Sequence, residues 1–446
     1  MANPLIGIFR VKELRERIFF TSIMLVVFRL GAFIPTPGIN AQALNSYFAS
    51  MRNQGAGRNA IVDYLDFFAG GAFSNFSVFM LGIMPYISMS IIMQLLIIVF
   101  PKLKKISQEE GGRKKIQKYQ RFGTVGVCLI QSFAVTQYAQ SISRSVENLL
   151  SLNMIPFTML AILTVTTGTM FLMWVGEQIT RRGIGNGISM LIFAGIVARL
   201  PQALWELFER VRNGDLNPVF VVVVFIMFVA VVALVVFEQQ GQRKIPVNYA
   251  KRIVGRKMYG GAPNAFIPFK INPSGVIPVI FASSILTFPL QIAQTIGENV
   301  AWLNAVSRAL TPRGTLYNIL YVLLIVFFAY FYTQVTLNPM EIAKNIRENG
   351  GSIPGIRSEK IEDYLTKILN RIVLPGSLYL AGIAVLPSII QYFFKFPSSI
   401  SYLMGGTSLL ILVGVDLDTM SQIEGLLKMH HHEGLTRRGR LRGRNL

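Results

Sequence analysis

The sequence has little charge, a single cysteine and none of the common nucleotide- or metal-binding motifs. Only 15% of its 446 residues are charged and 52% are hydrophobic, whereas soluble domains carry about a quarter charged residues. Much of the surface is therefore expected to meet lipid. Cys128 stands alone, which excludes an intrachain disulfide. Without a GxxxxGKS/T loop, an HExxH motif or paired CxxC motifs, we expect no nucleotide hydrolysis, no metal and no cofactor.

Hydrophobic runs long enough to cross a bilayer occur ten times. A bilayer core about 30 Å thick needs about 20 apolar residues in a helix. The sequence therefore predicts an all-α polytopic membrane protein. The predicted spans are 18–36, 76–100, 122–140, 154–176, 184–202, 217–238, 274–293, 316–337, 368–390 and 400–421.

Lys and Arg, 43 in all against 22 Asp and Glu, lie mainly on one side of these spans. The N-terminus and every second loop hold 33 of them, and the opposite loops hold 9. Because basic loops stay in the cytoplasm, both termini are predicted to be cytoplasmic. This bias explains most of the net charge of +21, although acidic lipids or ribosomal RNA would also be attracted.

The spans divide into two sets of five, in the predicted halves 1–213 and 214–423, followed by a basic tail at 424–446. Five is an odd number, so the second set would enter the membrane inverted. Transport paths in inverted repeats run between the halves, beside helices interrupted by Gly or Pro. The second helix of each set carries such a break, at Pro85 and Pro278. The alternative is that both prolines merely kink a helix.

The segment 61–73 is amphipathic and too short to span. Asp63 and Asp66 exclude full lipid exposure, and Gly70 and Gly71 are expected to end the helix. It is either a re-entrant half-helix on the outer side or a helix lying on the membrane surface.

Ionisable residues are almost absent from the span centres. Glu177 and Glu238 lie at helix ends, and Arg29, near the outer end of the first helix, is expected to pair or to reach the interface. A secondary transporter would need a polar substrate pocket and usually a buried charge. A scaffold protein would need no kinked apolar constriction. Neither alternative fits an uncharged interior rich in isoleucine.

Short motifs along the chain resemble those of the SecY family of protein-conducting channels. The matches run in order from about residue 10 to 425. They are FRLG at 28–31, IPTPG at 34–38, FAGGA at 68–72, GIMPYIS at 82–88, GEQIT at 176–180, GIGNGIS at 183–189, YAKR at 249–252, PGIR at 354–357 and GGTS at 405–408.

The resemblance implies the pore-forming subunit of a protein translocase in the bacterial inner membrane. Two inverted halves would surround an hourglass pore that passes unfolded secretory polypeptides, and a lateral gate would release transmembrane segments into lipid. Such a channel is not an enzyme: a partner ATPase, SecA, or the ribosome supplies the energy. The implied partners are SecE, SecG, SecA, the ribosome with its nascent chain, and signal sequences.

The resemblance also implies roles for individual residues. The pore ring would consist of Ile83, Ile87, Ile188, Ile192, Ile280 and Ile411. The plug would include Asp63, Asp66, Phe67, Phe68, Gly70 and Gly71. The lateral gate would include Gln94, Ser283, Ser284 and Thr287. Any one of these isoleucines or polar residues could instead serve ordinary helix packing, although the pairs 83/87 and 188/192 each share a helix face.

Two long cytoplasmic loops, 239–272 and 339–366, exceed what topology requires, and long loops in compact proteins are usually functional or disordered. Pro354 and Gly355 favour a tight turn that presents Arg357. The resemblance implies that these loops bind the motor. The docking residues would be Lys251, Arg252, Arg256, Lys257 and Arg357. The alternative is that their charge only sets the topology.

Overall fold

The computed structural model describes residues 11–44, 46–47, 66, 69–144, 146, 148–214, 217–249, 252–254, 257–259, 266–296, 314–394 and 406–438. Contacts divide the chain into two compact units. The first comprises Met1–Glu206, Pro289–Ser307 and Ile411–Leu446, and the second comprises Leu207–Phe288 and Arg308–Leu410. The predicted halves 1–213 and 214–423 stay a prediction.

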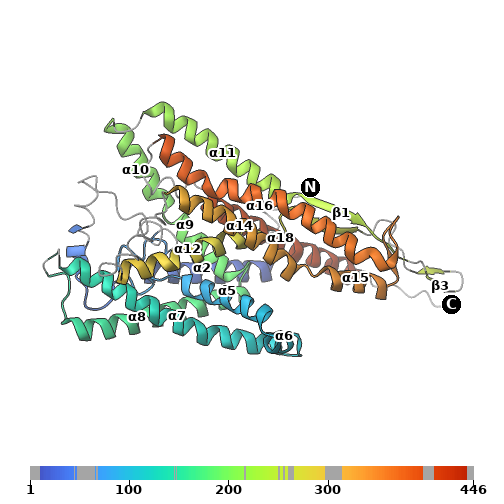
Figure 1. Cartoon of the computed structure of the whole chain (residues 1–446), viewed down its shortest axis with the longest axis horizontal. Coiled ribbons are helices and arrows are strands. Elements are labelled where there is room, and N and C mark those ends of the chain that lie inside the picture. The colour runs from blue at the N-terminus through green and yellow to red at the C-terminus, as the bar shows by residue number, and fades with distance from the viewer. Residues whose placement is uncertain are drawn as a thin grey trace. The chain divides into compact units, whose positions relative to one another are not determined.

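Long helices make up most of the first unit (Figure 1). They are α2 (Lys12–Gly31), α5 (Met84–Val99), α6 (Pro101–Gln108), α7 (Gly112–Ser143), α8 (Met154–Arg182), α9 (Gly187–Val197), the first part of α10 (Leu200–Arg212) and most of α18 (Gly406–Arg438). Helices α7 and α8 pack together, and α7 also packs against α5. Arg121 of α7 donates two hydrogen bonds to Glu177 of α8, at 2.9 and 2.5 Å.

The second unit combines helices with short strands. Its helices are α11 (Pro218–Gln240), most of α12 (Ile277–Ile296), α14 (Thr315–Thr336), α15 (Pro339–Glu348), the 3-10 helix η2 (Ser358–Lys360) and α16 (Ile361–Phe394). Helices α14 and α16 form the most extensive helix pair of the unit. Asn217 and Asn338 cap α11 and α15 by accepting hydrogen bonds from Val219 N and Met340 N, and a proline follows each cap, as helix starts favour.

Strands in the described residues occur only in the two long loops between these helices. Strand β1 (Gln242–Pro246) pairs antiparallel with β5 (Phe266–Lys270), and β3 (Arg252–Val254) pairs with β4 (Lys257–Tyr259). Strand β2 (Asn248–Tyr249) pairs with β6 (Gly351–Ser352). The last pair joins loop 239–272 to loop 339–366.

A hydrophobic core fills the space under these strands. It contains Ile245, Phe269, Ile346, Ile353 and Leu365, each at most 4% exposed. Both loops and the first turns of α16 contribute to it. The described parts of the two loops therefore share a hydrophobic core of their own.

Helices occupy all ten predicted spans, at α2, α5, α7, α8, α9, α11, α12, α14, α16 and α18. By length and composition, five helical stretches in the described part of the chain could cross a membrane, or six when α5 and α6, bent by 103° at Pro101, are counted as one. Helix α11 is the most apolar of them, and many of its large side chains are exposed, as a lipid-facing helix requires.

Candidate functional site

The turn that follows Asp66 lies in the first unit. Gly70 and Gly71 have φ angles of +64° and +93°, and Gly71 N donates to Asp66 O at 3.0 Å. Such a bond over five residues, with a left-handed glycine, closes helix C-termini. The backbone at Gly70 and Gly71 therefore has the geometry of a helix C-terminus, and a plug segment at 61–73 stays a prediction. Asp63, Phe67 and Phe68 lie outside the described residues.

The Asp66 carboxylate is fully buried and well bonded. It accepts hydrogen bonds from Ser74 N and Ser74 Oγ, both at 2.8 Å, and forms an ion pair with Arg199. Arg199 belongs to the connection between α9 and α10 and is itself largely buried. A buried carboxylate is tolerated only with such partners.

Arg29, on the last turn of α2, binds a backbone oxygen of the turn that follows Asp66. Its Nη1 donates to Gly70 O at 2.8 Å, and its guanidinium lies 5.3 Å from the centre of the Phe33 ring. Of the two expectations for Arg29, to pair or to reach the interface, these contacts favour pairing within the protein. Gly70 also approaches α9 closely: a β-carbon at position 70 would lie 2.7 Å from Gly195 Cα.

These contacts place the end of the plug segment beside two helices that carry predicted ring residues. Gly195 follows Ile192 by three residues, so the two share one face of α9. Ala69 lies against Gly82, directly before Ile83 at the start of α5. Ile83, Ile87 and Ile192 are buried, and Ile188 is half-buried. The structure thus brings the segment together with both isoleucine pairs, 83/87 and 188/192.

The connection between α8 and α9 is fixed from several directions, which orients Ile188 and Ile192. Asn186 caps α9 by accepting a hydrogen bond from Ile188 N at 3.1 Å. Gly187 N donates to Thr180 Oγ1 at 2.8 Å. Ile184 N donates to Thr21 Oγ1 on α2, and Gly185 N donates to Gln422 Oε1 on α18.

For the other two predicted ring residues, the structure gives their burial and their unit but no contact with the plug segment. Ile411, on α18, is buried in the first unit. Ile280, on α12, is half-buried in the second unit. A closed ring of all six isoleucines stays a prediction.

Aromatic rings fix the chain directly after the plug segment. Phe73, Phe76 and Tyr138 form a cluster with centroids 6.0 to 6.2 Å apart. Phe79 stacks between Phe28 and Phe171. We call residues 76–79 the aromatic segment. Its rings attach the connection between α2 and α5 to α2, α7 and α8.

Polar groups lie at the predicted lateral-gate positions. Gln94 Oε1 and Ser284 Oγ are buried and have no hydrogen-bond partner among the described residues. Ser283 Oγ donates to Ile280 O within its own helix. Nothing is described of the Thr287 side chain. Gln94 belongs to the first unit and the two serines to the second.

The described docking residues lie in the two paired loops, 239–272 and 339–366, of the second unit. Gly355 has a φ of +79°, and Ile356 N donates to Ile353 O at 3.1 Å, which is a tight turn with Pro at its second position and Gly at its third. Arg357 follows the turn and is exposed. The predicted turn is thus present. Arg252 and Lys257 begin the paired strands β3 and β4, and Lys251 and Arg256 lie outside the described residues.

Sequence reasoning missed Arg199 and Gly195. Arg199 lies inside the predicted span 184–202 and was not singled out. Its charge and that of Asp66 both stand in apolar surroundings and need partners, but the sequence does not show that they pair with each other. Nothing in the sequence marks Gly195 as the point of contact.

Known proteins similar to this chain agree with the resemblance seen in the motifs. The SecY family model matches residues 77–420. Curated relatives named "Protein translocase subunit SecY" include one from Borreliella burgdorferi, 44% identical with 96% of both chains covered, and one from Escherichia coli K12, 43% identical with 97% of this chain and 96% of the relative covered.

Solved structures share the fold at lower identity. "The structure of a protein conducting channel" covers 92% of this chain and 91% of its own, with a TM-score of 0.64 and 20% identity. "Sec61 in the Canine ribosome-channel complex from the endoplasmic reticulum" gives the same coverage, a TM-score of 0.60 and 19% identity. The prediction of an all-α membrane protein is confirmed. On this evidence, the chain belongs to the SecY family.

Proposed function

We propose that this chain is the pore-forming subunit of a protein translocase, a channel that passes unfolded polypeptides across the membrane and releases apolar segments sideways into lipid. The observation that carries the proposal is the seating of the turn after Asp66 against α5 and α9. A buried, releasable segment beside two pairs of isoleucines is what a closed channel for arbitrary chains requires. An apolar constriction excludes water and ions without offering specific bonds to a passing chain.

The proposed ring consists of Ile83, Ile87, Ile188, Ile192, Ile280 and Ile411. Local support comes from the burial of the α5 pair and from the rigid connection that orients α9. The proposed plug comprises Asp63, Asp66, Phe67, Phe68, Gly70 and Gly71. Its described part lies against α5 and α9, two of the ring helices in the first unit.

The proposed lateral gate contains Gln94, Ser283, Ser284 and Thr287. Support comes from the buried, unpartnered oxygen atoms of Gln94 and Ser284, since buried polar groups normally find partners. Hydrogen bonds between helices within membranes contribute about 0.6 kcal/mol each on average. A few such bonds would hold a gate closed and still yield to an apolar signal sequence.

The proposed motor surface is the exposed face of the two paired cytoplasmic loops. Arg357 follows the turn after Ile353, which belongs to the shared core of the loops, and Arg offers a fork that grips a carboxylate or phosphate in two places. Arg252 and Lys257 lie on the paired strands β3 and β4. We propose SecA and the ribosome as alternative motors and SecE and SecG as membrane partners. The location is the bacterial inner membrane, with both termini in the cytoplasm.

One reconstitution tests the whole proposal. Vesicles carrying the channel with its small partners and SecA should import a secretory precursor when ATP is added. Arg357→Glu should abolish import while leaving idle vesicles ion-tight, because it removes motor contact only. Combined Ile87→Ser and Ile192→Ser should make idle vesicles leak ions. Import at the wild-type rate with Arg357→Glu, or an unchanged ion barrier with the serine pair, would contradict the assignment. Uptake of small solutes instead of precursors would indicate a secondary transporter.

A further inference from the structure

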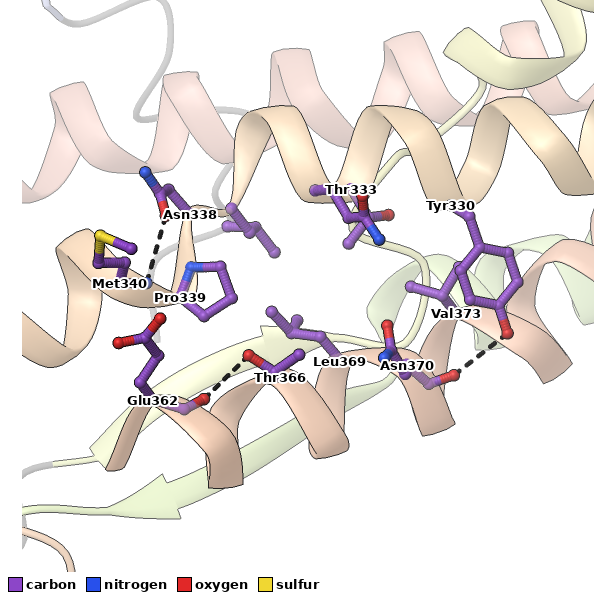
Figure 2. A pocket seen from close by; sticks show the side chains of 12 residues that line it. Tyr330, Thr333, Asn338, Pro339, Met340, Glu362, Thr366, Leu369, Asn370 and Val373 are labelled. Atoms are coloured by element: carbon purple, nitrogen blue, oxygen red, sulfur yellow. Dashed lines mark hydrogen bonds between the residues drawn. The ribbon is translucent and has the colours of Figure 1, made fainter. Parts of the chain in front are cut away.

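A cavity of about 250 Å³ lies between α14, the start of α15 and the start of α16 in the second unit. Figure 2 shows it from close by. Its floor is formed by the buried residues Thr333, Leu369 and Val373, and the exposed amides of Gln334 and Asn370 lie at its rim. The cavity is therefore open to the surface and has both polar and apolar walls.

Glu362 is the only charged residue among those that line the cavity. It stands in the first turn of α16, and Figure 2 shows its side chain reaching from α16 toward Pro339 and Met340. The dashed line beside Glu362 in Figure 2 is the hydrogen bond that Thr366 Oγ1 donates to the Glu362 backbone oxygen, at 2.9 Å. It does not involve the Glu362 carboxylate. A half-buried carboxylate with no lysine or arginine in the wall favours a cationic ligand.

The other polar atoms of the wall already have local partners that hold its shape. Tyr330 OH donates to Asn370 O at 3.3 Å, and Thr333 Oγ1 donates to Ala329 O at 2.7 Å. Asn338 accepts from Met340 N as the cap of α15. The amide side chains of Gln334 and Asn370 still offer N–H donors, so the wall can meet an anionic group next to a cation.

The cavity lies where α14 changes from apolar to polar residues, which is the level of a membrane interface, and Tyr330 is a typical interface residue. On the same face of α14, toward the membrane centre, follow Phe327, Leu323 and Ile319, which are 58%, 61% and 54% exposed. Their spacing of three to four residues keeps them on one stripe. From Tyr330 to Ile319 the helix rises about 16 Å, close to the thickness of one leaflet, about 15 Å.

We propose that this cavity binds the headgroup of an ethanolamine phospholipid, with the acyl chains along the apolar stripe of α14. The primary ammonium would donate to the Glu362 carboxylate, and the phosphate would accept from the amides of Gln334 and Asn370. An anionic headgroup such as glycerol phosphate would meet an uncompensated carboxylate. A choline headgroup carries the charge but has no N–H to donate. Free phosphoethanolamine shares the headgroup chemistry but cannot use the stripe.

The test uses the full-length channel complex in nanodiscs and counts lipids that remain bound after transfer to detergent, by native mass spectrometry. Wild type should retain phosphatidylethanolamine in preference to phosphatidylcholine and phosphatidylglycerol. Glu362→Gln should weaken this retention about tenfold, since it removes a charge-assisted bond. The matched control is Asp363→Asn: Asp363 stands in the same first turn but does not line the cavity, and its change should have no effect.

Two further arms separate the sources of binding. Leu323→Ser should weaken retention of the lipid without changing competition by free phosphoethanolamine, because only the lipid uses the stripe. Equal retention of the three lipids by wild type would overturn the proposal even if Glu362→Gln failed to fold. The same holds if Glu362→Gln has no effect, if Asp363→Asn weakens retention equally, or if phosphatidylglycerol binds best. Displacement of the lipid only by a partner protein's lysine-rich segment would point to a protein site instead.

Discussion

Two neighbouring parts of the connection between α2 and α5 are held in different ways. Asp66 and Gly70, in the plug segment, are held by two arginines through an ion pair and a backbone hydrogen bond. The aromatic segment, residues 76–79, is held by stacked rings from three helices. Only a few residues separate a polar attachment from an apolar one.

The difference bears on which part can move. Releasing an ion pair into water lets both charges recover their hydration, so the net free energy is small even though removal of one partner costs much. Aromatic rings that leave a packed site lose their packing contacts and gain no favourable hydration in return. We therefore expect the plug segment to detach while the aromatic segment stays in place and limits how far it travels.

The largest effect on folding is expected from the aromatic segment. Phe76 is 2% exposed, and Phe76→Ala should lower the free energy of unfolding by about 3–5 kcal/mol, as the loss of a buried ring does. Thermal unfolding in detergent, followed by size-exclusion chromatography, measures this. Phe133→Ala is the control, because Phe133 lies on α7 and is half exposed. Equal stability of the two variants would show that the rings do not anchor the segment.

The next effect concerns the plug segment itself. Asp66→Asn leaves Arg199 buried without its counter-charge, which should favour release by about 3 kcal/mol, or about a hundredfold in population. A cysteine at Ala69, which is buried, reports release by its reaction rate in the idle channel. The background is Cys128→Ser. An unchanged rate would mean that the ion pair does not hold the segment.

A second variant sharpens this reading. Asp66→Asn combined with Arg199→Gln should release the segment less than Asp66→Asn alone, because no unpaired charge remains buried. The coupling between the two sites is obtained from a double-mutant cycle. Additive effects would indicate that each residue acts separately.

Sequence alone predicts what is local. The ten spans follow from apolar runs, and the tight turn before Arg357 follows from Pro354 and Gly355. Asp66 stands out because a carboxylate among apolar residues needs a partner. Its partner Arg199 lies 133 residues away, and no pattern in one sequence links the two. Likewise, strands of two residues, such as β2 and β6, carry too little signal to predict that the two long loops, 239–272 and 339–366, pair with each other.

Comparing alanine substitutions at two neighbouring glycines distinguishes the effect of backbone strain from the effect of a steric contact. Both Gly70 and Gly71 need positive φ, so alanine costs about 1–2 kcal/mol at either. At position 70 alone, the new methyl group would also press on Gly195 Cα, whereas at 71 it meets only Arg199 side-chain atoms at 3.7 Å. Gly70→Ala should therefore release the segment more than Gly71→Ala, measured with the same cysteine at 69. The reverse order would argue against close contact with α9.

The smallest effect is expected for Arg29→Gln. The change removes a hydrogen bond to Gly70 O, which contributes about 1 kcal/mol. It also removes a positive charge near that of Arg199, because both guanidinium groups lie beside the Gly70–Gly71 turn, and the loss of repulsion between them offsets part of the effect. The cysteine at 69 should therefore react less than tenfold faster than in the parent, well below the rate with Asp66→Asn. If Arg29→Gln released the segment as strongly as Asp66→Asn, the ion pair would not be the main attachment. The hydrogen bond from Arg29 to the backbone of Gly70 would then be the interaction that holds the plug segment.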